Sequence, residues 1–305
     1  MNPLPDWLPG DLRGGFRLGP RRFPGRVWTA SGCFGYGLGG RDLVAPDGRS
    51  ALDGLGAVVT KTVTLAPRRG NPPPRIWDAG PGALNSIGLE NVGLQRFLDE
   101  VAPALEAAAV PFVVSIAGTA PGQFGVMTER LHASAAAYVH WHGVELNLSC
   151  PNVAEGGVDF GRDPATVRAC VEAAAGAAGD RALLAKLTPN VACIAELARA
   201  AADGGAHGVT AINTLLGIDI DLSTGRPVLP LRRGGYSGPA ILPVALAKVD
   251  EIVGGTGLPV VGVGGIRRLD DALKFFAVGA TAVQVGTAQM DNPFAAADIA
   301  AAFAD

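Results

Sequence analysis

Eight short runs of apolar, often β-branched residues recur along this chain of 305 residues, and their spacing constrains the fold more than any other feature. Each run has the length of a buried strand. The runs cover residues 26–30, 57–62, 111–117, 144–149, 182–188, 208–213, 259–263 and 282–286. Helical patterns, with apolar residues three and four apart, lie between most of them and after the last. These patterns cover residues 95–108, 128–141, 164–178, 191–203, 240–253, 269–277 and 293–303.

This alternation of strand and helix predicts parallel strand pairing. Eight such units in about 250 residues match an α/β protein that folds as a (β/α)8 TIM barrel, here as one domain over residues 1–305. An open doubly wound sheet is the alternative, and its G-x-G-x-x-G pattern occurs at Gly35, Gly37 and Gly40. No amphipathic helix follows Gly40, because residues 41–50 have the composition of a turn-rich loop. The barrel is therefore the preferred prediction.

Composition narrows the classes of ligand. A net charge of −3 and an isoelectric point near 5.8 predict no surface for nucleic acid. The four cysteines lie far apart, without a C-x-x-C pair, which predicts no metal, no iron–sulfur cluster and no disulfide framework, and favours a reducing cytoplasm. The sequence shows neither a signal peptide nor a run of about 18 apolar residues, so no membrane contact is expected. The expected ligands are small molecules.

Polar residues gather at the C-terminal ends of the predicted strands, where barrel enzymes place their catalytic groups. In the fourth strand Glu145, Asn147 and Ser149 share the face that points into the barrel, because side chains alternate along a strand. The same alternation directs Lys61 and Lys186 into the mouth. Two lysines in one confined space favour an anionic ligand, and the structural alternative is an ion pair inside the barrel. The four histidines have no expected catalytic role, since they precede strands or lie on helices, two of them at the end of the predicted helix 128–141.

Glycines follow the last two predicted strands, at Gly264, Gly265 and Gly286. Loops at these places in a barrel commonly bind phosphate through exposed backbone N–H groups. The glycines therefore predict a phosphate site, with ordinary turns as the structural alternative. Ser115, in the third strand, is either a polar contact in the mouth or a simple backbone cap.

Nine ordered segments carry a family resemblance that runs through almost the whole chain. They are "ASGCFGYG", "VVTKTVTLAPRRGNPPPR", "LNSIGLEN", "ELNLSCPNVAEGGVDFGRDP", "AKLTPN", "INTLLG", "GGYSGPAI", "GVGGI" and "VQVGTA". The sequence resembles the dihydroorotate dehydrogenases, flavin enzymes of pyrimidine synthesis, and most closely the catalytic subunit of the NAD-linked bacterial type. The long basic and proline-rich segment and the extended loop after Cys150 are typical of that type.

The resemblance implies that FMN binds at the C-terminal mouth of the barrel. Dihydroorotate would lose a hydride from C6 to the flavin and a proton from C5 to a base, which would be Cys150. The structural alternative for Cys150 is a buried, inert thiol. The implied flavin contacts are Ser31, Lys61, Thr62, Asn147, Lys186, Ile212, Gly238, Gly264, Gly265, Gly286 and Thr287. The implied substrate contacts are Lys61, Asn85, Ser86, Ile87, Gly88, Leu89, Asn147, Asn152, Asn213 and Thr214.

Two positions depart from the family pattern, since Ser115 stands where relatives have Asn and Cys33 where Thr is frequent. The resemblance also implies a homodimer with an electron-transfer subunit that carries FAD and a [2Fe–2S] cluster and reacts with NAD⁺. A self-sufficient fumarate-linked enzyme, or a related dihydropyrimidine dehydrogenase, is an alternative within the same chemistry. Outside it remain a barrel lyase or isomerase that uses the phosphate site for its substrate, and a catalytically silent flavin-binding subunit.

Overall fold

The computed structural model describes residues 5, 8, 12–149 and 160–304. Its centre is a closed barrel of eight strands, each parallel to its neighbours. In barrel order these are β3 (Val27–Thr29), β4 (Ala57–Val59), β7 (Phe112–Ile116), β8 (Trp141–Asn147), β9 (Ala182–Lys186), β10 (Gly208–Ala211), β15 (Val260–Val263) and β16 (Ala282–Val285). Each predicted run overlaps one of these strands. The TIM barrel prediction is confirmed, and the doubly wound alternative is wrong.

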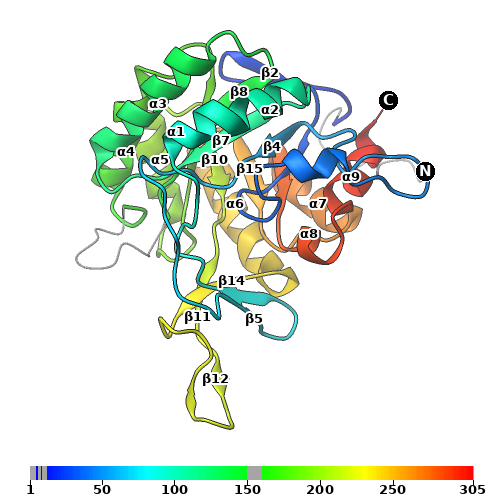
Figure 1. The fold of residues 1–305 in the computed structure, drawn as a ribbon, viewed down its shortest axis with the longest axis vertical. Helices are drawn as coiled ribbons and strands as arrows, with labels where there is room; N and C mark the ends of the chain where they lie inside the picture. Colours follow the sequence, from blue (N-terminus) through cyan, green and yellow to red (C-terminus); the bar gives the residue numbers. More distant parts are fainter. Residues whose placement is uncertain (1–4, 6–7, 9–11, 150–159, 305) are drawn as a thin grey trace.

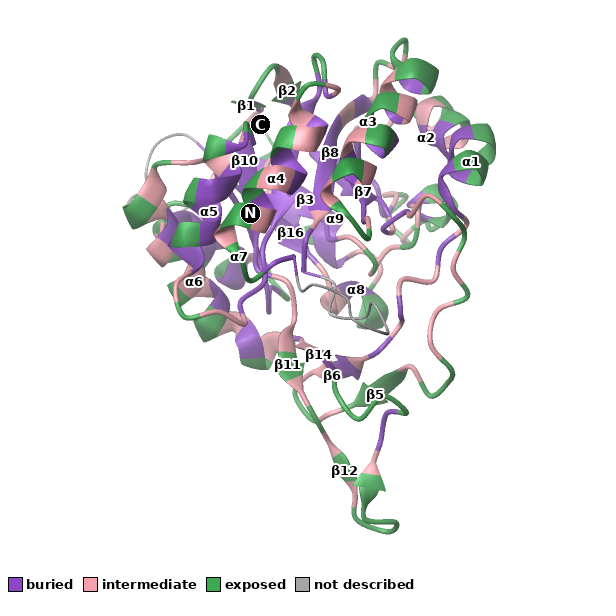
Figure 2. Cartoon of the chain, turned by 90° about the vertical axis from the view of Figure 1, so that its left-hand side faces the viewer, coloured by how far each residue is buried: buried purple, intermediate pink, exposed green. Residues whose placement is uncertain are grey.

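Helices cover the outside of the barrel with their buried faces turned toward the strands (Figures 1 and 2). They are α1 (Leu94–Arg96), α2 (Ala102–Ala107), α3 (Pro121–Ala135), α4 (Pro164–Ala175), α5 (Ile194–Asp203), α6 (Leu242–Thr256), α7 (Leu269–Ala277), α8 (Ala288–Asp291) and α9 (Ala295–Ala300). The π-helical turn η2 (Phe97–Val101) joins α1 to α2, and short 3-10 turns form η1 (Leu38–Arg41), η3 (Pro239–Ile241) and η4 (Ala301–Phe303). Among the described residues no helix is both long and apolar enough to cross a membrane.

The predicted helix 128–141 is displaced from the helix that forms. α3 begins at Pro121, whose fixed φ suits the first turn of a helix, and it ends at Ala135. Trp141 belongs instead to β8, where its indole N–H donates to the Gly143 carbonyl oxygen and the Arg181 guanidinium lies 4.8 Å from the centre of its ring. His142 is therefore a strand residue, and it does not lie at a helix end.

The N-terminal end of the barrel is closed by apolar packing. A hairpin of β1 (Phe16–Leu18) and β2 (Arg21–Phe23) lies across this end. Its Phe23 ring stacks 4.5 Å from the ring of Trp28, and both side chains are fully buried. The interior cluster continues through Val59, Leu184 and Val261. A ligand site inside the barrel can therefore open only at the opposite, C-terminal end.

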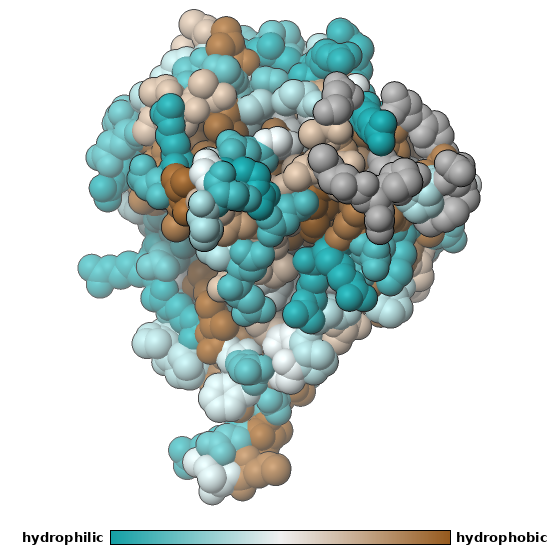
Figure 3. Space-filling view, turned by 90° about the vertical axis from the view of Figure 1, so that its right-hand side faces the viewer, coloured by the Kyte–Doolittle hydropathy of each residue, from teal (hydrophilic) through white to brown (hydrophobic). Residues whose placement is uncertain are grey.

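An antiparallel extension projects beside that open end and tapers away from the body (Figures 1 and 3). Its four-stranded sheet has the order β11 (Leu215–Gly217), β14 (Gly234–Ser237), β6 (Ala83–Asn85) and β5 (Ile76–Asp78). The hairpin of β12 (Ile220–Asp221) and β13 (Arg226–Pro227) continues it outward. The sequence patterns did not predict these short strands. They bring two loops, which are far apart in the sequence, to one side of the mouth.

Candidate active site

A cavity of about 850 Å³ opens at the C-terminal ends of the barrel strands, a size typical of small-molecule sites. Every described residue that the sequence assigns to cofactor or substrate lines this cavity, with one exception. These lining residues are Ser31, Lys61, Thr62, Asn85, Ile87, Gly88, Leu89, Asn147, Lys186, Ile212, Asn213, Thr214, Gly238, Gly264, Gly265, Gly286 and Thr287. Cys150 and Asn152 lie outside the described residues.

Ser86 is the exception, and it is 2% exposed. Its hydroxyl accepts a hydrogen bond of 2.9 Å from the Asn71 side chain, and its carbonyl oxygen accepts another from the same amide at 3.1 Å. Its backbone N–H donates to the Arg75 carbonyl oxygen at 2.7 Å. These groups are hydrogen-bonded within the loop, and a substrate contact by Ser86 stays a prediction.

The floor of the cavity holds a buried ion pair. Lys186, at the end of β9, is 5% exposed, and its ammonium nitrogen lies 3.9 Å from Oε1 of the fully buried Glu145. The other carboxylate oxygen, Oε2, accepts hydrogen bonds of 2.8 Å from the Thr210 hydroxyl and from the Gln284 amide. Strand alternation therefore directs both charged side chains inward, as predicted, and the two alternatives for Lys186 coexist, because it both forms an ion pair and lines the cavity.

Hydroxyl and amide groups form a connected network on one wall. The Thr62 hydroxyl lies 3.2 Å from that of Ser31 and 2.9 Å from that of Ser115, and it accepts a hydrogen bond of 3.2 Å from the Asn147 amide. Ser31 in turn donates to the Thr60 carbonyl oxygen at 2.8 Å. Ser115 is fully buried behind Thr62 and is not among the lining residues. It supports the wall through Thr62.

Lys61 lies at the rim with a shared counter-ion. Its ammonium nitrogen is 3.8 Å from Glu90 Oε2, which also accepts a hydrogen bond of 2.8 Å from Arg75. Glu90 lines the cavity but was not identified from the sequence, because the loop that carries it has no strand or helix periodicity. Lys61 thus brings a positive charge, partly compensated by Glu90, to the cavity.

The glycines after β15 form a cradle that side chains would fill. Gly265 has φ +80°, and a Cβ atom added there would lie 2.8 Å from the backbone nitrogen of Leu242, at the start of α6. At Gly264, with φ +135°, a Cβ atom would lie 2.7 Å from the Cβ of Ala245. Glycine is therefore required for the turn and for this close approach to a helix N-terminus, a combination that favours anion binding.

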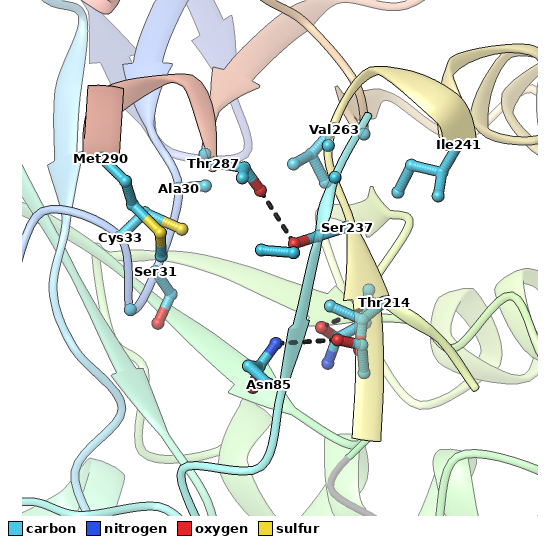
Figure 4. A pocket seen from close by; sticks show the side chains of 18 of the residues that line it. Ala30, Ser31, Cys33, Asn85, Thr214, Ser237, Ile241, Val263, Thr287 and Met290 are labelled. Carbon is cyan, nitrogen blue, oxygen red and sulfur yellow. Dashed lines mark hydrogen bonds between the residues drawn. The ribbon is translucent and has the colours of Figure 1, made fainter. Parts of the chain in front are cut away.

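A second part of the cradle comes from β14 and α8. The Thr287 hydroxyl donates to that of Ser237 at 2.9 Å, and the two side chains face each other in Figure 4. Gly238, which follows Ser237, has φ +108°. Ser237 lines the cavity and was missed by the sequence analysis, because it belongs to the unpredicted extension. The Gly235 carbonyl oxygen, in β14 of the same extension, accepts a hydrogen bond of 3.1 Å from the Asn85 side-chain amide.

Cys33 is a further residue that the sequence left without a role, and it lines the cavity, as does Met290 (Figure 4). Burial raises the pKa of the Cys33 thiol, and the positive charge of Lys186 partly opposes this increase. Cys33 is thus a neutral thiol near neutral pH. In contrast, His142 and His207 lie at the closed end of the barrel, where His142 packs 5.1 Å from the Phe23 ring. No histidine is among the described residues that line the cavity.

Comparison with known proteins decides the family. The family model described as dihydroorotate dehydrogenase matches residues 18–305. This chain belongs to the dihydroorotate dehydrogenase family. It is 44% identical over 283 residues to the "Dihydroorotate dehydrogenase B (NAD(+)), catalytic subunit" of Trichlorobacter lovleyi, covering 93% of this chain and 90% of that protein. It is 43% identical over 273 residues to the protein of the same name from Bacillus pumilus, covering 90% of this chain and 84% of that protein.

Dihydroorotate dehydrogenases are generally flavin-dependent enzymes, and the donor set of this cavity fits FMN. The glycine cradle and the Ser237–Thr287 pair suit a phosphate, and Lys186 suits a ring that gains negative charge on reduction. Family membership also rules out the barrel lyase or isomerase that remained as an alternative.

Proposed function

We propose that this dihydroorotate dehydrogenase oxidises dihydroorotate to orotate in pyrimidine biosynthesis, with FMN bound at the barrel mouth. The observation that carries the proposal is one cavity that combines a glycine cradle, a buried lysine at its floor and amide side chains on its walls. The names of the relatives from Trichlorobacter lovleyi and Bacillus pumilus support the reaction.

FMN, when bound, supplies the acceptor for the hydride from C6 of the substrate. Its phosphate would be held by backbone N–H groups of Gly264, Gly265, Gly286 and Thr287, with Gly238 nearby. Lys186 would lie near the edge of the ring that becomes negative, and would stabilise the reduced form. Further contacts would come from Ser31, Lys61, Thr62, Asn147 and Ile212.

Amide side chains would bind the substrate, because Asn85, Asn147 and Asn213 can each donate and accept hydrogen bonds with a flat ring of carbonyl and N–H groups. The backbone of residues 86–89, with Thr214, would bind its carboxylate, and Lys61 would add positive charge; of these, residues 87–89, Thr214 and Lys61 line the cavity. Asn152 would complete this set from outside the described residues.

Cys150 would accept the C5 proton as general base. It follows Ser149, which lines the cavity and whose hydroxyl donates to the Lys186 carbonyl oxygen at 3.0 Å. This bond holds Ser149 beside the cavity floor, so the residue that directly precedes Cys150 lies at the site. A thiolate base needs a reduced thiol, which favours action in a reducing cytoplasm.

We also propose that electrons leave through a partner. The relatives are named as catalytic subunits of an NAD(+) enzyme. The corresponding arrangement here is a homodimer with a subunit that carries FAD and a [2Fe–2S] cluster and reacts with NAD⁺. The alternative is a self-sufficient enzyme that passes electrons to fumarate.

Anaerobic mixing of the purified, FMN-loaded chain with dihydroorotate tests the reaction. We expect the flavin absorbance at about 450 nm to bleach within a single turnover. Dihydrouracil in place of dihydroorotate is the control for a related pyrimidine, since it lacks the carboxylate. Bleaching by dihydrouracil alone, or by neither compound, would contradict the proposed substrate.

The acceptor is tested with the same protein. The chain alone is expected to reduce artificial dyes but not NAD⁺, and to gain NAD⁺ activity when the electron-transfer subunit is added. Rapid fumarate reduction by the chain alone would instead establish the fumarate-linked alternative.

A further inference from the structure

Glu145 is a charged residue in the barrel interior for which the proposed function has no role. Its side chain is fully buried, and it lies two residues before Asn147 on the inward face of β8. Its register partner on β9, Leu184, belongs to the apolar cluster of the barrel interior. A carboxylate in such a place loses its hydration, and a buried ion pair is often no more stabilising than an apolar residue of similar size. Closure of the barrel therefore does not account for Glu145.

The two oxygens of Glu145 have different surroundings. Oε2 is fixed by hydrogen bonds from Thr210 on β10 and Gln284 on β16, both at 2.8 Å. Oε1 has no hydrogen-bond partner among the described residues, although it is buried. It lies 3.9 Å from the Lys186 ammonium nitrogen. Two strands therefore hold the carboxylate so that its free oxygen faces Lys186.

The distance defines the kind of interaction. At 3.9 Å the pair is beyond ordinary hydrogen-bond length but within range of strong Coulomb attraction in a buried site. The attraction thus draws the Lys186 ammonium toward the cavity floor, although Glu145 does not accept a hydrogen bond from its N–H groups. The positive charge that Lys186 brings to the cavity is therefore partly compensated by the Glu145 carboxylate.

We propose that Glu145 is a positioning residue that holds the Lys186 ammonium at the cavity floor and offsets part of its charge, and thereby sets the reduction potential of the bound flavin. The inference rests on the proposed function, since it requires that Lys186 contact bound FMN. A hydride from dihydroorotate would bring two electrons and one proton to the flavin, which would then carry one negative charge. A lysine with a counter-ion stabilises that charge less than a lysine without one, so Glu145 keeps the potential low enough for electrons to leave.

The test is the two-electron midpoint potential of bound FMN in Glu145→Gln, measured at pH 7 against a reference dye. The amide keeps the size of the side chain but removes its charge. We expect the equilibrium ratio of reduced to oxidised flavin to rise about tenfold, equivalent to a potential about 30 mV higher. Lys186→Met should shift the potential in the opposite direction. In the Lys186→Met background, Glu145→Gln should cause no further increase, because the charge through which it acts is gone.

Glu251→Gln is the matched control. Glu251 also pairs with a lysine, Lys248, at 3.0 Å, but it lies on α6 outside the barrel. Its substitution should leave the flavin potential unchanged. If Glu145→Gln does not fold, Glu145→Asp serves instead, because the shorter side chain withdraws the charge from Lys186 and should raise the potential by a smaller amount.

The outcomes separate the two proposals. If the unsubstituted chain binds no FMN or is not reduced by dihydroorotate, the proposed function fails and this inference fails with it. If it is reduced normally, but the Glu145 variants have an unchanged or lower potential, only the positioning role is wrong. An equal increase with and without Lys186 would also overturn it, since Glu145 would then act directly on the flavin.

Discussion

Loss of one charge of the buried Lys186–Glu145 pair should strongly destabilise the flavin-free protein, and removal of the second charge should restore most of the stability. Replacement of Lys186 with Met removes the cation and leaves a fully buried carboxylate that has hydrogen bonds to only one oxygen. Opposite charges about 4 Å apart attract by about 4 kcal/mol at an effective dielectric constant of about 20. Loss of one partner of a buried pair costs about 3–5 kcal/mol, because the other charge stays uncompensated. We therefore expect Lys186→Met to lower the free energy of unfolding by about 3–5 kcal/mol.

The double variant tests whether the uncompensated Glu145 charge causes the loss of stability. Addition of Glu145→Gln to Lys186→Met removes the uncompensated charge, so most of the lost stability should return. Arg96→Met is the control for an ordinary ion pair, because Arg96 and Glu100 are both more than half exposed and such pairs contribute little.

Urea unfolding of the flavin-free protein measures these differences. Circular dichroism and tryptophan fluorescence should give coincident transitions, which is the condition for a two-state free energy. A loss of less than about 1 kcal/mol in Lys186→Met, or no recovery in the double variant, would refute the view that these two charges compensate each other.

Three further predictions follow from other parts of the structure. Gly265→Ala should weaken FMN retention and destabilise the protein by about 1–3 kcal/mol, because φ is +80° and the new Cβ would press on the start of α6. The control Gly254→Ala, which has open space around it in α6, should be neutral or slightly stabilising. Dialysis measures FMN retention, and urea unfolding measures stability. Cys150→Ala should keep FMN but slow its reduction by dihydroorotate by about 10²–10⁴-fold in stopped-flow measurements, and an unchanged rate would exclude Cys150 as the base. Burial lowers the pKa of His142 and of His207, so the unfolded chain takes up protons that the folded chain does not. Stability should therefore fall as the pH drops below about 6.5, and unfolding curves of a variant with both histidines replaced by Gln should show a smaller decrease between about pH 7 and pH 5.

The sequence predicted the parts of the fold that depend on local patterns. The eight strand segments were recognisable because apolar residues cluster over the length of a buried strand. The inward direction of Lys186 and Asn147 followed from alternation along β9 and β8. The error at residues 128–141 has a local cause as well, because Trp141 and His142 fit the end of a helical pattern as well as the start of a strand.

The extension beside the mouth had no comparable signal. Its strands are two to four residues long, too short for any periodicity to be read from the sequence. Their pairing joins β6 to β14, which lie far apart in the chain, so Ser237 and Gly235 became part of the site only through this contact. The burial of Ser86 had no signal for the same reason, since its hydrogen bonds to Asn71 depend on how the loop folds back.

The sequence by itself determined the number of barrel strands, their inward faces, the glycine positions and most of the polar residues that meet at the mouth. These properties are local, because side-chain alternation and backbone freedom act over a few residues. Only the tertiary structure decided that the free oxygen of Glu145 faces Lys186, since barrel closure brings Thr210 and Gln284 from other strands to hold the second oxygen. Charge interactions depend on distance in space and not along the chain, so strand alternation could place both residues on inward faces but could not give the distance between them.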